Sequence, residues 1–123
     1  KLMTQKKIPT MDARVLILGF TFKENCPDIR NTRVIDIVAE FNNNCVQVDV
    51  YDPWLNIKEA EQKYPISFLN ELSTTQYDAI ILAVNHDQFK EMGAKKIHAL
   101  GKKNHVLFDV KNILPKDQVD GRL

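Results

Sequence analysis

The sequence predicts an α/β fold with a doubly wound parallel sheet, and three apolar runs are the main observation. Residues 14–18, 78–84 and 106–110 are largely apolar, and the first two are continuous runs, which are typical of strands buried on both faces. A segment at 33–42 has apolar residues at helical spacing instead. Strands that alternate with helices predict βαβ units with right-handed crossovers, and therefore helices on both faces of the sheet.

The other predicted elements are shorter, and turn or capping residues separate them. They are a strand at 46–51, a charged helix at 57–64, a weak strand at 65–68, a helical turn at 70–75, a helix containing Phe89 and Met92, and a helix at 95–100. Thr32 or Asn31 can cap the helix at 33–42, and Asn56 can cap the next one. We expect Pro115 to end regular structure.

Five strands in the order 3-2-1-4-5 would make a Rossmann-like, three-layer α/β/α fold. The chain then reverses direction between the first and fourth strands, and ligands bind in the crevice that this reversal opens at the carboxyl ends of the strands. Three segments should meet there: the loop at 19–32, the pair Asn85 and His86, and the exit of the last strand at Lys111. The loop is the strongest candidate because it exceeds the usual βα connection of about 2–6 residues, and long loops in compact domains are often functional.

Length and composition set the class of protein. The 123 residues suit one domain at 11–123, and residues 1–10 look like a basic linker from a missing preceding segment. A net charge of +1 provides no strong field for nucleic acid or an anionic membrane. No apolar run approaches the roughly 20 residues of a membrane span, and no signal peptide opens the chain. Two cysteines without metal or redox spacing fit free thiols in a reducing cytoplasm.

The loop lacks the glycines of a dinucleotide-binding turn. A Gly-x-Gly-x-x-Gly pattern would follow the first strand, but Gly19 is followed by Phe20, Thr21 and Phe22. Their absence argues against ordinary dinucleotide binding here, because those glycines let the backbone approach a pyrophosphate. Asp52, after the second strand, has two interpretations: an acid that binds a ribose diol, or a turn residue.

Cations at this edge suggest a local phosphate site instead. Lys23 is a mobile point charge suited to phosphate, and Lys111 should leave the last strand at the same edge. Arg30 offers a planar donor fork to a phosphate or carboxylate, or it pairs with an acidic neighbour. Phe22 either packs against a ligand ring or belongs to the core. The alternative for each lysine is an ordinary solvated side chain.

The remaining reactive side chains suggest no further chemistry. Cys26 lies in the loop without a nearby histidine to act as its base, so we do not expect a catalytic nucleophile there. His86, His98 and His105 lack a compact metal-ligand spacing, so no metal is expected, and the last two look like surface residues. Trp54 is more simply explained by packing than by ligand binding.

Four motifs occur in the order found in one enzyme family. They are GFTFKENCPDIRNT at 19–32, VYDP at 50–53, DAIILAVNHDQF at 78–89 and FDVK at 108–111. Together they closely resemble the carboxyl-terminal domain of the nucleotide-sugar 6-dehydrogenases, which include UDP-glucose, GDP-mannose and UDP-N-acetylhexosamine dehydrogenases. The variant KENCPD followed by RNTR is most similar to the UDP-N-acetylhexosamine branch, including the Vi-antigen type of polysaccharide biosynthesis.

The resemblance implies that the chain is one part of an NAD-dependent dehydrogenase that makes a UDP-hexosaminuronic acid for bacterial surface polysaccharide. In such enzymes an amino-terminal Rossmann domain holds NAD, a helical middle segment forms the dimer, and the carboxyl-terminal domain binds the UDP part of the UDP-sugar. A cysteine in the missing portion carries the substrate through a thiohemiacetal and a thioester during two hydride transfers. The fragment alone should therefore be inactive, and the parent enzyme a cytoplasmic homodimer or larger.

The resemblance also implies roles for single residues. Phe22 and Lys23 match the family's pair that contacts substrate. Lys111 takes a phosphate-binding place where other branches have arginine, and this exchange keeps the charge but loses the bidentate fork.

Other matched positions leave more open. Asn85 and His86 should line the crevice. Asp28, Arg30 and Asn31 match signature positions that either touch substrate or brace the interface between domains. Two alternatives for the whole chain are a stand-alone NAD-binding regulatory module, which the glycine-poor loop disfavours, and a structural domain that holds oligomer contacts.

Overall fold

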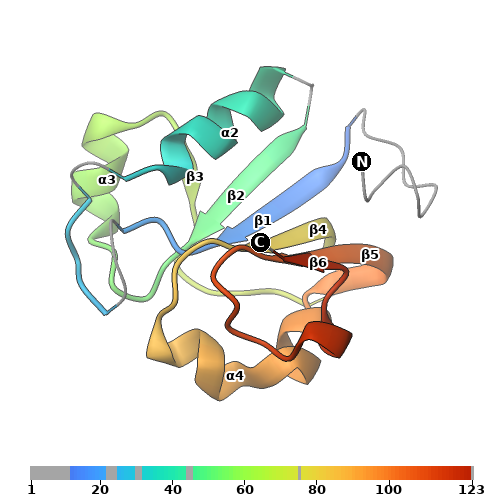
Figure 1. The fold of residues 1–123 in the computed structure, drawn as a ribbon. Helices are drawn as coiled ribbons and strands as arrows, with labels where there is room; N and C mark the ends of the chain where they lie inside the picture. Colours follow the sequence, from blue (N-terminus) through green and yellow to red (C-terminus); the bar gives the residue numbers. More distant parts are fainter. Residues whose placement is uncertain (1–11, 22–24, 30–31, 44–45, 75, 123) are drawn as a thin grey trace.

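A computed structural model of the chain describes residues 12–21, 25–29, 32–43, 46–74 and 76–122 (Figure 1). Within these residues the strands form one parallel sheet in the order β3-β2-β1-β4-β5-β6. The elements are β1 (Arg14–Leu18), α2 (Val34–Asn43), β2 (Gln47–Tyr51), α3 (Ile57–Lys63), β3 (Ser67–Phe68), β4 (Tyr77–Leu82), α4 (Asp87–His98), β5 (Gly101–Asp109), the 3₁₀ turn η1 (Lys116–Gln118) and β6 (Gly121–Arg122). The predicted order of the first five strands is confirmed.

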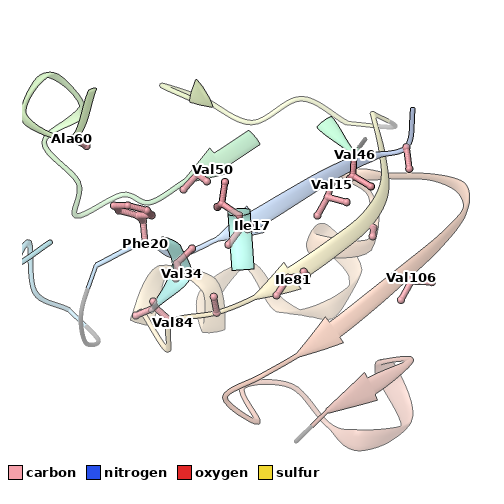
Figure 2. Close-up of a cluster of buried hydrophobic side chains, with 14 of the residues drawn as sticks. Val15, Ile17, Phe20, Val34, Val46, Val50, Ala60, Ile81, Val84 and Val106 are labelled. Carbon is pink, nitrogen blue, oxygen red and sulfur yellow. The ribbon is translucent and has the colours of Figure 1, made fainter. Parts of the chain in front are cut away.

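Helices cover both faces of the sheet, which confirms the doubly wound fold. Figure 1 shows α2 and α3 on one side and α4 on the other. Along β1, Val15 and Ile17 join the cluster beneath α2 and α3, which Figure 2 shows, whereas Leu16 and Leu18 join the cluster beneath α4. Alternate residues of a strand point to opposite faces, so β1 serves both cores and is the buried centre of the molecule.

The helix boundaries follow from capping residues. The Thr32 hydroxyl accepts a hydrogen bond from the Val34 N–H at 3.3 Å, at the start of α2. Asn56 is the N-cap of α3, and its side chain accepts from the Glu59 N–H at 3.1 Å. Both caps agree with the sequence prediction, and they satisfy N–H groups that a helix start leaves without a helical partner. The other proposed cap of α2, Asn31, lies outside the described residues.

The segment after β4 agrees with the prediction of two helices. The run α4 consists of two helical pieces that meet at a kink at Gly93, where the backbone is not helical and φ is 73°. Glycine adopts a positive φ without a steric penalty, so it separates the two pieces. The helical turn expected at 70–75 is not a helix in its described part, 70–74.

The carboxyl-terminal part is more regular than the sequence suggested. Strand β5 begins at Gly101, before the apolar run at 106–110, and η1 and β6 follow Pro115. Asp120 holds this tail to β5, because its carboxylate accepts from the Leu107 N–H at 2.7 Å. Such a long-range bond leaves no local pattern in the sequence. No helix in the described part of the chain is long and apolar enough to cross a membrane.

Gly19 ends β1 where two strand exits touch. Its φ is 107°, and a Cβ on this residue would lie 2.6 Å from Val84 Cβ and 2.8 Å from the Val84 backbone nitrogen. A Cβ therefore meets backbone that cannot swing away, in a conformation that L-residues rarely adopt.

Gly19→Ala is expected to lower the free energy of unfolding by about 3 kcal/mol, since overpacking costs about 1–3 kcal/mol and a left-handed backbone about 1–2 kcal/mol more. Urea unfolding measures this loss. Gly93→Ala is the matched control: Gly93 also has positive φ, at 73°, but a Cβ there meets nothing within 4 Å. Equal losses in the two variants would contradict the role given to the Val84 contact.

Candidate functional site

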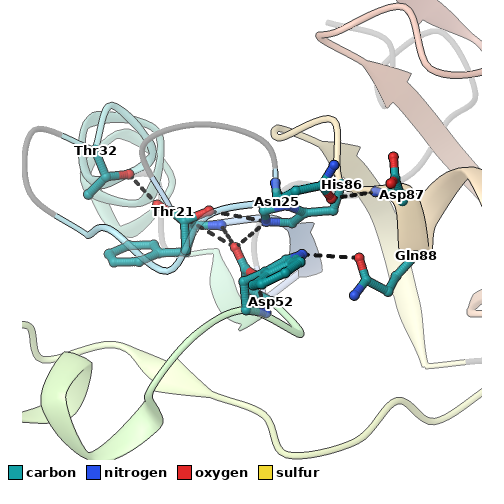
Figure 3. Close-up of polar contacts among 9 residues, drawn as sticks. Thr21, Asn25, Thr32, Asp52, His86, Asp87 and Gln88 are labelled. Atoms are coloured by element: carbon teal, nitrogen blue, oxygen red, sulfur yellow. Dashed lines mark hydrogen bonds and ion pairs between the residues drawn. The ribbon is translucent and has the colours of Figure 1, made fainter.

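The exits of β1, β2, β4 and β5 meet at the carboxyl edge of the sheet. Parallel pairing sets Leu18 beside Tyr51 and Leu82, and Leu82 beside Asp109. The residues that follow these strand ends therefore gather at one edge, which is where open α/β sheets bind ligands. Figure 3 shows the polar contacts among residues that follow β1, β2 and β4.

Asp52 is the centre of this network. Its Oδ2 accepts from the N–H groups of Phe20 at 2.7 Å and Thr21 at 3.0 Å, and it lies 2.9 Å from His86 Nε2. Its Oδ1 accepts from the Trp54 N–H at 2.8 Å. The turn expected at Asp52 is therefore present, and the same carboxylate also binds the start of the β1–α2 loop.

The buried Asp52 carboxylate is held in its charged form. Burial alone would raise the pKa of this group, but the hydrogen bonds from His86, Phe20 and Thr21 outweigh that effect and place the pKa below its usual value of 3.8. A buried carboxylate remains ionised when several donors replace its lost water.

Acid should therefore weaken the fold through Asp52. Because the folded carboxyl has the lower pKa, the unfolded chain binds the proton first. The stability from Asp52 is then complete above the unfolded pKa and is lost as the pH falls through the folded one. Urea unfolding between pH 7 and pH 3 should show a steeper loss in the native chain than in Asp52→Asn, and parallel profiles would contradict this assignment.

His86 is the partner of Asp52, and we call this buried pair the brace. Its ring is fully buried, and Nδ1 accepts from the Asn25 N–H at 2.8 Å. That bond requires a lone pair on Nδ1, so the neutral ring carries its proton on Nε2 and donates it to Asp52. The Thr21 hydroxyl lies 3.1 Å from the same Nε2.

The brace fixes the long loop on both sides of residues 22–24. Phe20 and Thr21 are bound by Asp52 on one side, and Asn25 is bound by His86 on the other. Asn25 has a φ of 53°, and its side chain accepts from the Asp87 N–H at 3.0 Å. Residues after two strand exits thus hold the backbone of Phe20, Thr21 and Asn25 on either side of 22–24.

Trp54 stands at the rim of this edge. Its side chain is 37% exposed, and its Nε1 donates to Gln88 Oε1 at 3.2 Å. The ring lies over His86 at a centroid distance of 6.4 Å. We expected Trp54 to be buried by packing, whereas the residue is exposed and its ring is tilted by 41° to that of His86.

A small cavity of about 130 Å³ lies at the same edge, against the start of α2. Its lining includes Thr21 and Val84, together with two cationic residues, Arg33 and Lys111. Asp109 shapes the turn that carries Lys111, since its buried carboxylate accepts from the N–H of Lys111 at 3.2 Å and of Leu114 at 2.8 Å. The cavity joins cations from two chain segments that are distant in sequence.

Some of the predicted site residues belong to the described part of the chain and others lie outside it. Lys111 is exposed beside the cavity, His86 is buried in the brace, and Asn85 is half-buried beside it. Asn85 Oδ1 is a buried acceptor without a hydrogen-bond partner in the described part of the chain. Phe22, Lys23 and Arg30, like Asn31, lie outside the described residues, so their roles stay predictions.

Two residues at this edge had been missed or undervalued. Asp52 was expected to bind a ribose or make a turn; it makes the turn, and its carboxylate also contacts Phe20, Thr21 and His86. Arg33 was counted only as the start of a helix, and it lines the cavity. The position of Arg33 could have indicated a role. A cation at the start of a helix is disfavoured, because the helix dipole prefers anions at that end, so an arginine there calls for another reason.

The geometry does not fit NAD at the turn after β1. The amides of Phe20 and Thr21, which a dinucleotide site would turn towards a pyrophosphate, donate to Asp52 instead. The Asp52 side chain is 0% exposed, so its carboxylate is not presented to a ribose diol. The backbone amides and the acidic side chain that a dinucleotide site would use therefore bind one another inside this domain.

Residues 16–116 match the profile of the UDP-glucose/GDP-mannose dehydrogenase family, UDP binding domain. The chain belongs to this family. It is 51% identical over 123 residues to the UDP-N-acetyl-D-glucosamine 6-dehydrogenase of Salmonella typhi, covering all of this chain and 29% of that protein. It is 50% identical to the enzyme of the same name from Pseudomonas aeruginosa, again over 29% of that protein. The chain thus spans less than a third of these relatives.

Solved structures of the family share the fold. The UDP-D-ManNAc dehydrogenase of Pyrococcus horikoshii superposes with a TM-score of 0.77 at 21% identity, over 98% of this chain and 27% of that one. An NDP-N-acetyl-D-galactosaminuronic acid dehydrogenase from Methanosarcina mazei gives a TM-score of 0.77 at 24% identity, over 95% of this chain and 24% of that one. These likenesses support the Rossmann-like α/β architecture.

Proposed function

We propose that this chain binds the UDP moiety of a UDP-N-acetylhexosamine within an NAD-dependent 6-dehydrogenase that makes a UDP-hexosaminuronic acid for bacterial surface polysaccharide. The observation that carries the proposal is the loop at 19–32, which is anchored on both sides of Lys23 by Asp52 and His86. Membership of the UDP-binding family supports the ligand class. The identity with two UDP-N-acetyl-D-glucosamine 6-dehydrogenases supports the sugar class.

Charge is the first contribution of the domain. A diphosphate carries negative charge that Lys23 and Lys111 would neutralise from two sides, with Arg33 beside Lys111 at the cavity. The chain has a net charge of only +1, so attraction to phosphate must come from this local cluster. Phe22 and Arg30 are proposed to contact the substrate from the same loop.

Preorganisation is the second contribution. The buried Asp52–His86 pair fixes the backbone of Phe20, Thr21 and Asn25, the described residues that flank 22–24. Flanking residues that are already in place lose less entropy when ligand binds. We therefore assign His86 a positioning role behind the loop, and Asn85, with its buried Oδ1 open to a donor, the contact with substrate.

The rest of the active site is proposed to lie in the preceding portion of the parent enzyme. The cavity of about 130 Å³ is well below the roughly 300–1,000 Å³ of sites that enclose small ligands, which supports a pocket that a second domain completes. NAD, bound by that domain, would accept hydride from C6 of the sugar. The described residues of this chain contribute binding and orientation, and the preceding portion would also supply the catalytic cysteine and the dimer contacts, in the cytoplasm.

Separate titrations of the 123-residue chain with UDP and with NAD test the proposal. We expect UDP to bind weakly, with a Kd near the millimolar range, and to shift the NMR amide signals of Thr21, Val84 and Lys111. NAD should leave these signals unchanged, and a mixture with NAD and UDP-N-acetylglucosamine should produce no NADH. Preferential NAD binding would support the regulatory alternative instead, and binding of neither ligand, by the chain or by the full-length protein, would support a structural domain.

A further inference from the structure

The cavity against the start of α2 differs in charge from two larger cavities of the described residues. Its lining contains the cations Arg33 and Lys111 and no acidic residue. A cavity of about 460 Å³ beside α4 and η1 is lined by two lysines and two aspartates. A cavity of about 420 Å³ beside α3 is lined by Asp28, Glu59 and Lys63. Of these three cavities, the first alone has cations in its lining without a carboxylate.

Neither of its cations is paired with a carboxylate of the described residues. The ion pairs there join other side chains, and the buried carboxylate of Asp109, two residues before Lys111, accepts from backbone N–H groups. Arg33 and Lys111 are both exposed. One exposed cation by itself indicates nothing, but two that line the same small cavity indicate an anion.

The size and the walls of the cavity favour a particular anion. Its volume of about 130 Å³ is that of roughly four water molecules at about 30 Å³ each, which suits a single phosphate group with its four oxygens. Val34, Ala83 and Val110 are among the apolar residues of the lining. Charges interact more strongly beside apolar walls than in open water.

Hydrogen bonds fix the backbone beside both cations. Next to Arg33, the Thr32 hydroxyl donates to the Phe20 carbonyl oxygen and accepts from the N–H of the first residue of α2. The Lys111 N–H donates to the Asp109 carboxylate at 3.2 Å. A ligand would therefore order the two side chains on a backbone that is already in place, which lowers the entropic cost of binding.

We propose that Arg33 is a further substrate-binding residue: its guanidinium binds two oxygens of one phosphate of the UDP-sugar, while Lys111 adds charge from the end of β5. The inference rests on the proposed function and adds a division of labour between the two cations. A guanidinium offers a planar fork of N–H donors that matches two phosphate oxygens, whereas an ammonium is a point charge. The two side chains are therefore not interchangeable.

Competitive inhibition of the full-length enzyme by UDP tests the assignment, with uridine, which has no phosphate, as the control ligand. We expect Arg33→Gln to raise the inhibition constant of UDP about 10-fold, the loss expected for a hydrogen-bonded charge, and to leave that of uridine unchanged. Arg33→Lys should weaken UDP nearly as much, because it keeps the charge without the fork. Lys111→Arg in the Arg33→Gln background should recover most of the affinity, since it returns a fork to the same cavity.

A matched variant controls for the loss of an exposed cation. Lys58→Gln changes α3 outside the lining of the cavity and should leave both inhibition constants unchanged. Urea unfolding should give Arg33→Gln and Lys58→Gln nearly equal stabilities, because exposed substitutions have small effects. Native-like UDP binding by Arg33→Lys would overturn the role of the fork. Equal effects of Arg33→Gln on UDP and on uridine would overturn the phosphate contact.

Lys111→Ala separates a failure of this inference from a failure of the proposed function. If Lys111→Ala weakens UDP binding and Arg33→Gln does not, Arg33 is an ordinary solvated side chain and the UDP-binding function stands. If the native full-length enzyme binds no UDP, the proposed function fails and the inference fails with it.

Discussion

Replacing Asp52 by alanine should lower the free energy of unfolding by about 3–5 kcal/mol. The carboxylate is buried and accepts from Phe20, Thr21, Trp54 and His86, and each buried donor that loses its partner costs about 1–3 kcal/mol, less than additively when the donors relax together. Urea unfolding at pH 7 measures the loss. In the full-length enzyme the same variant should raise KM for the UDP-sugar, because the loop loses its anchor.

Asp87→Ala is the matched control for this prediction. Asp87 is a carboxylate of the same edge, but its side chain is 65% exposed and pairs with Lys90 only at 3.9 Å. Exposed pairs of this kind contribute about 0–1 kcal/mol. A loss at Asp52 no larger than that at Asp87 would show that the network does not hold the loop.

Replacing Lys23 by alanine in the full-length enzyme should raise KM for the UDP-sugar about 10–100-fold. Hydrogen bonds to charged groups contribute about 1.5–3 kcal/mol, and each 1.4 kcal/mol is about a tenfold change in affinity. Lys111→Ala should have a similar but smaller effect, because Arg33 lines the same cavity and partly replaces the lost charge. Steady-state kinetics with varied UDP-sugar and saturating NAD provide the measurement.

Two controls make this result specific to the diphosphate. Lys58→Ala removes an exposed lysine of α3, which is outside the lining of the cavity, and should leave KM unchanged. Lys23→Arg keeps the charge and should recover most of the affinity. Equal effects of Lys23→Ala and Lys58→Ala would show that the loop lysine is an ordinary solvated side chain.

The sequence was most informative where local pattern and tertiary position agree. The aliphatic run of β1 and the buried run of β4 gave the centre of the sheet, and the order of the first five strands followed from the handedness of βαβ connections. Asn56 was identified as a cap because its effect is confined to the first turn of one helix. The lack of glycines after β1 led us to expect no ordinary dinucleotide site there, and the amides of Phe20 and Thr21 donate to Asp52.

Long-range hydrogen bonds account for most of what the sequence did not reveal. Asp120 binds the Leu107 N–H and gives the polar tail a strand, although Pro115 had seemed to end regular structure. His98 and His105 are seven residues apart and share no helical face, so only the return of β5 against α4 brings their nitrogens to 2.8 Å. Neither contact has a local signature.

The chain's own residues determined its fold class and its family, because strand periodicity and motif order are properties of the sequence, and the edge at which a ligand should bind stays a prediction from the same pattern. Only the tertiary structure decided that Asp52 and His86 serve the loop from behind rather than facing a ligand. Their roles depend on which donors lie within hydrogen-bond distance once β1, β2 and β4 are paired, and that distance is set by the packed sheet rather than by spacing along the chain.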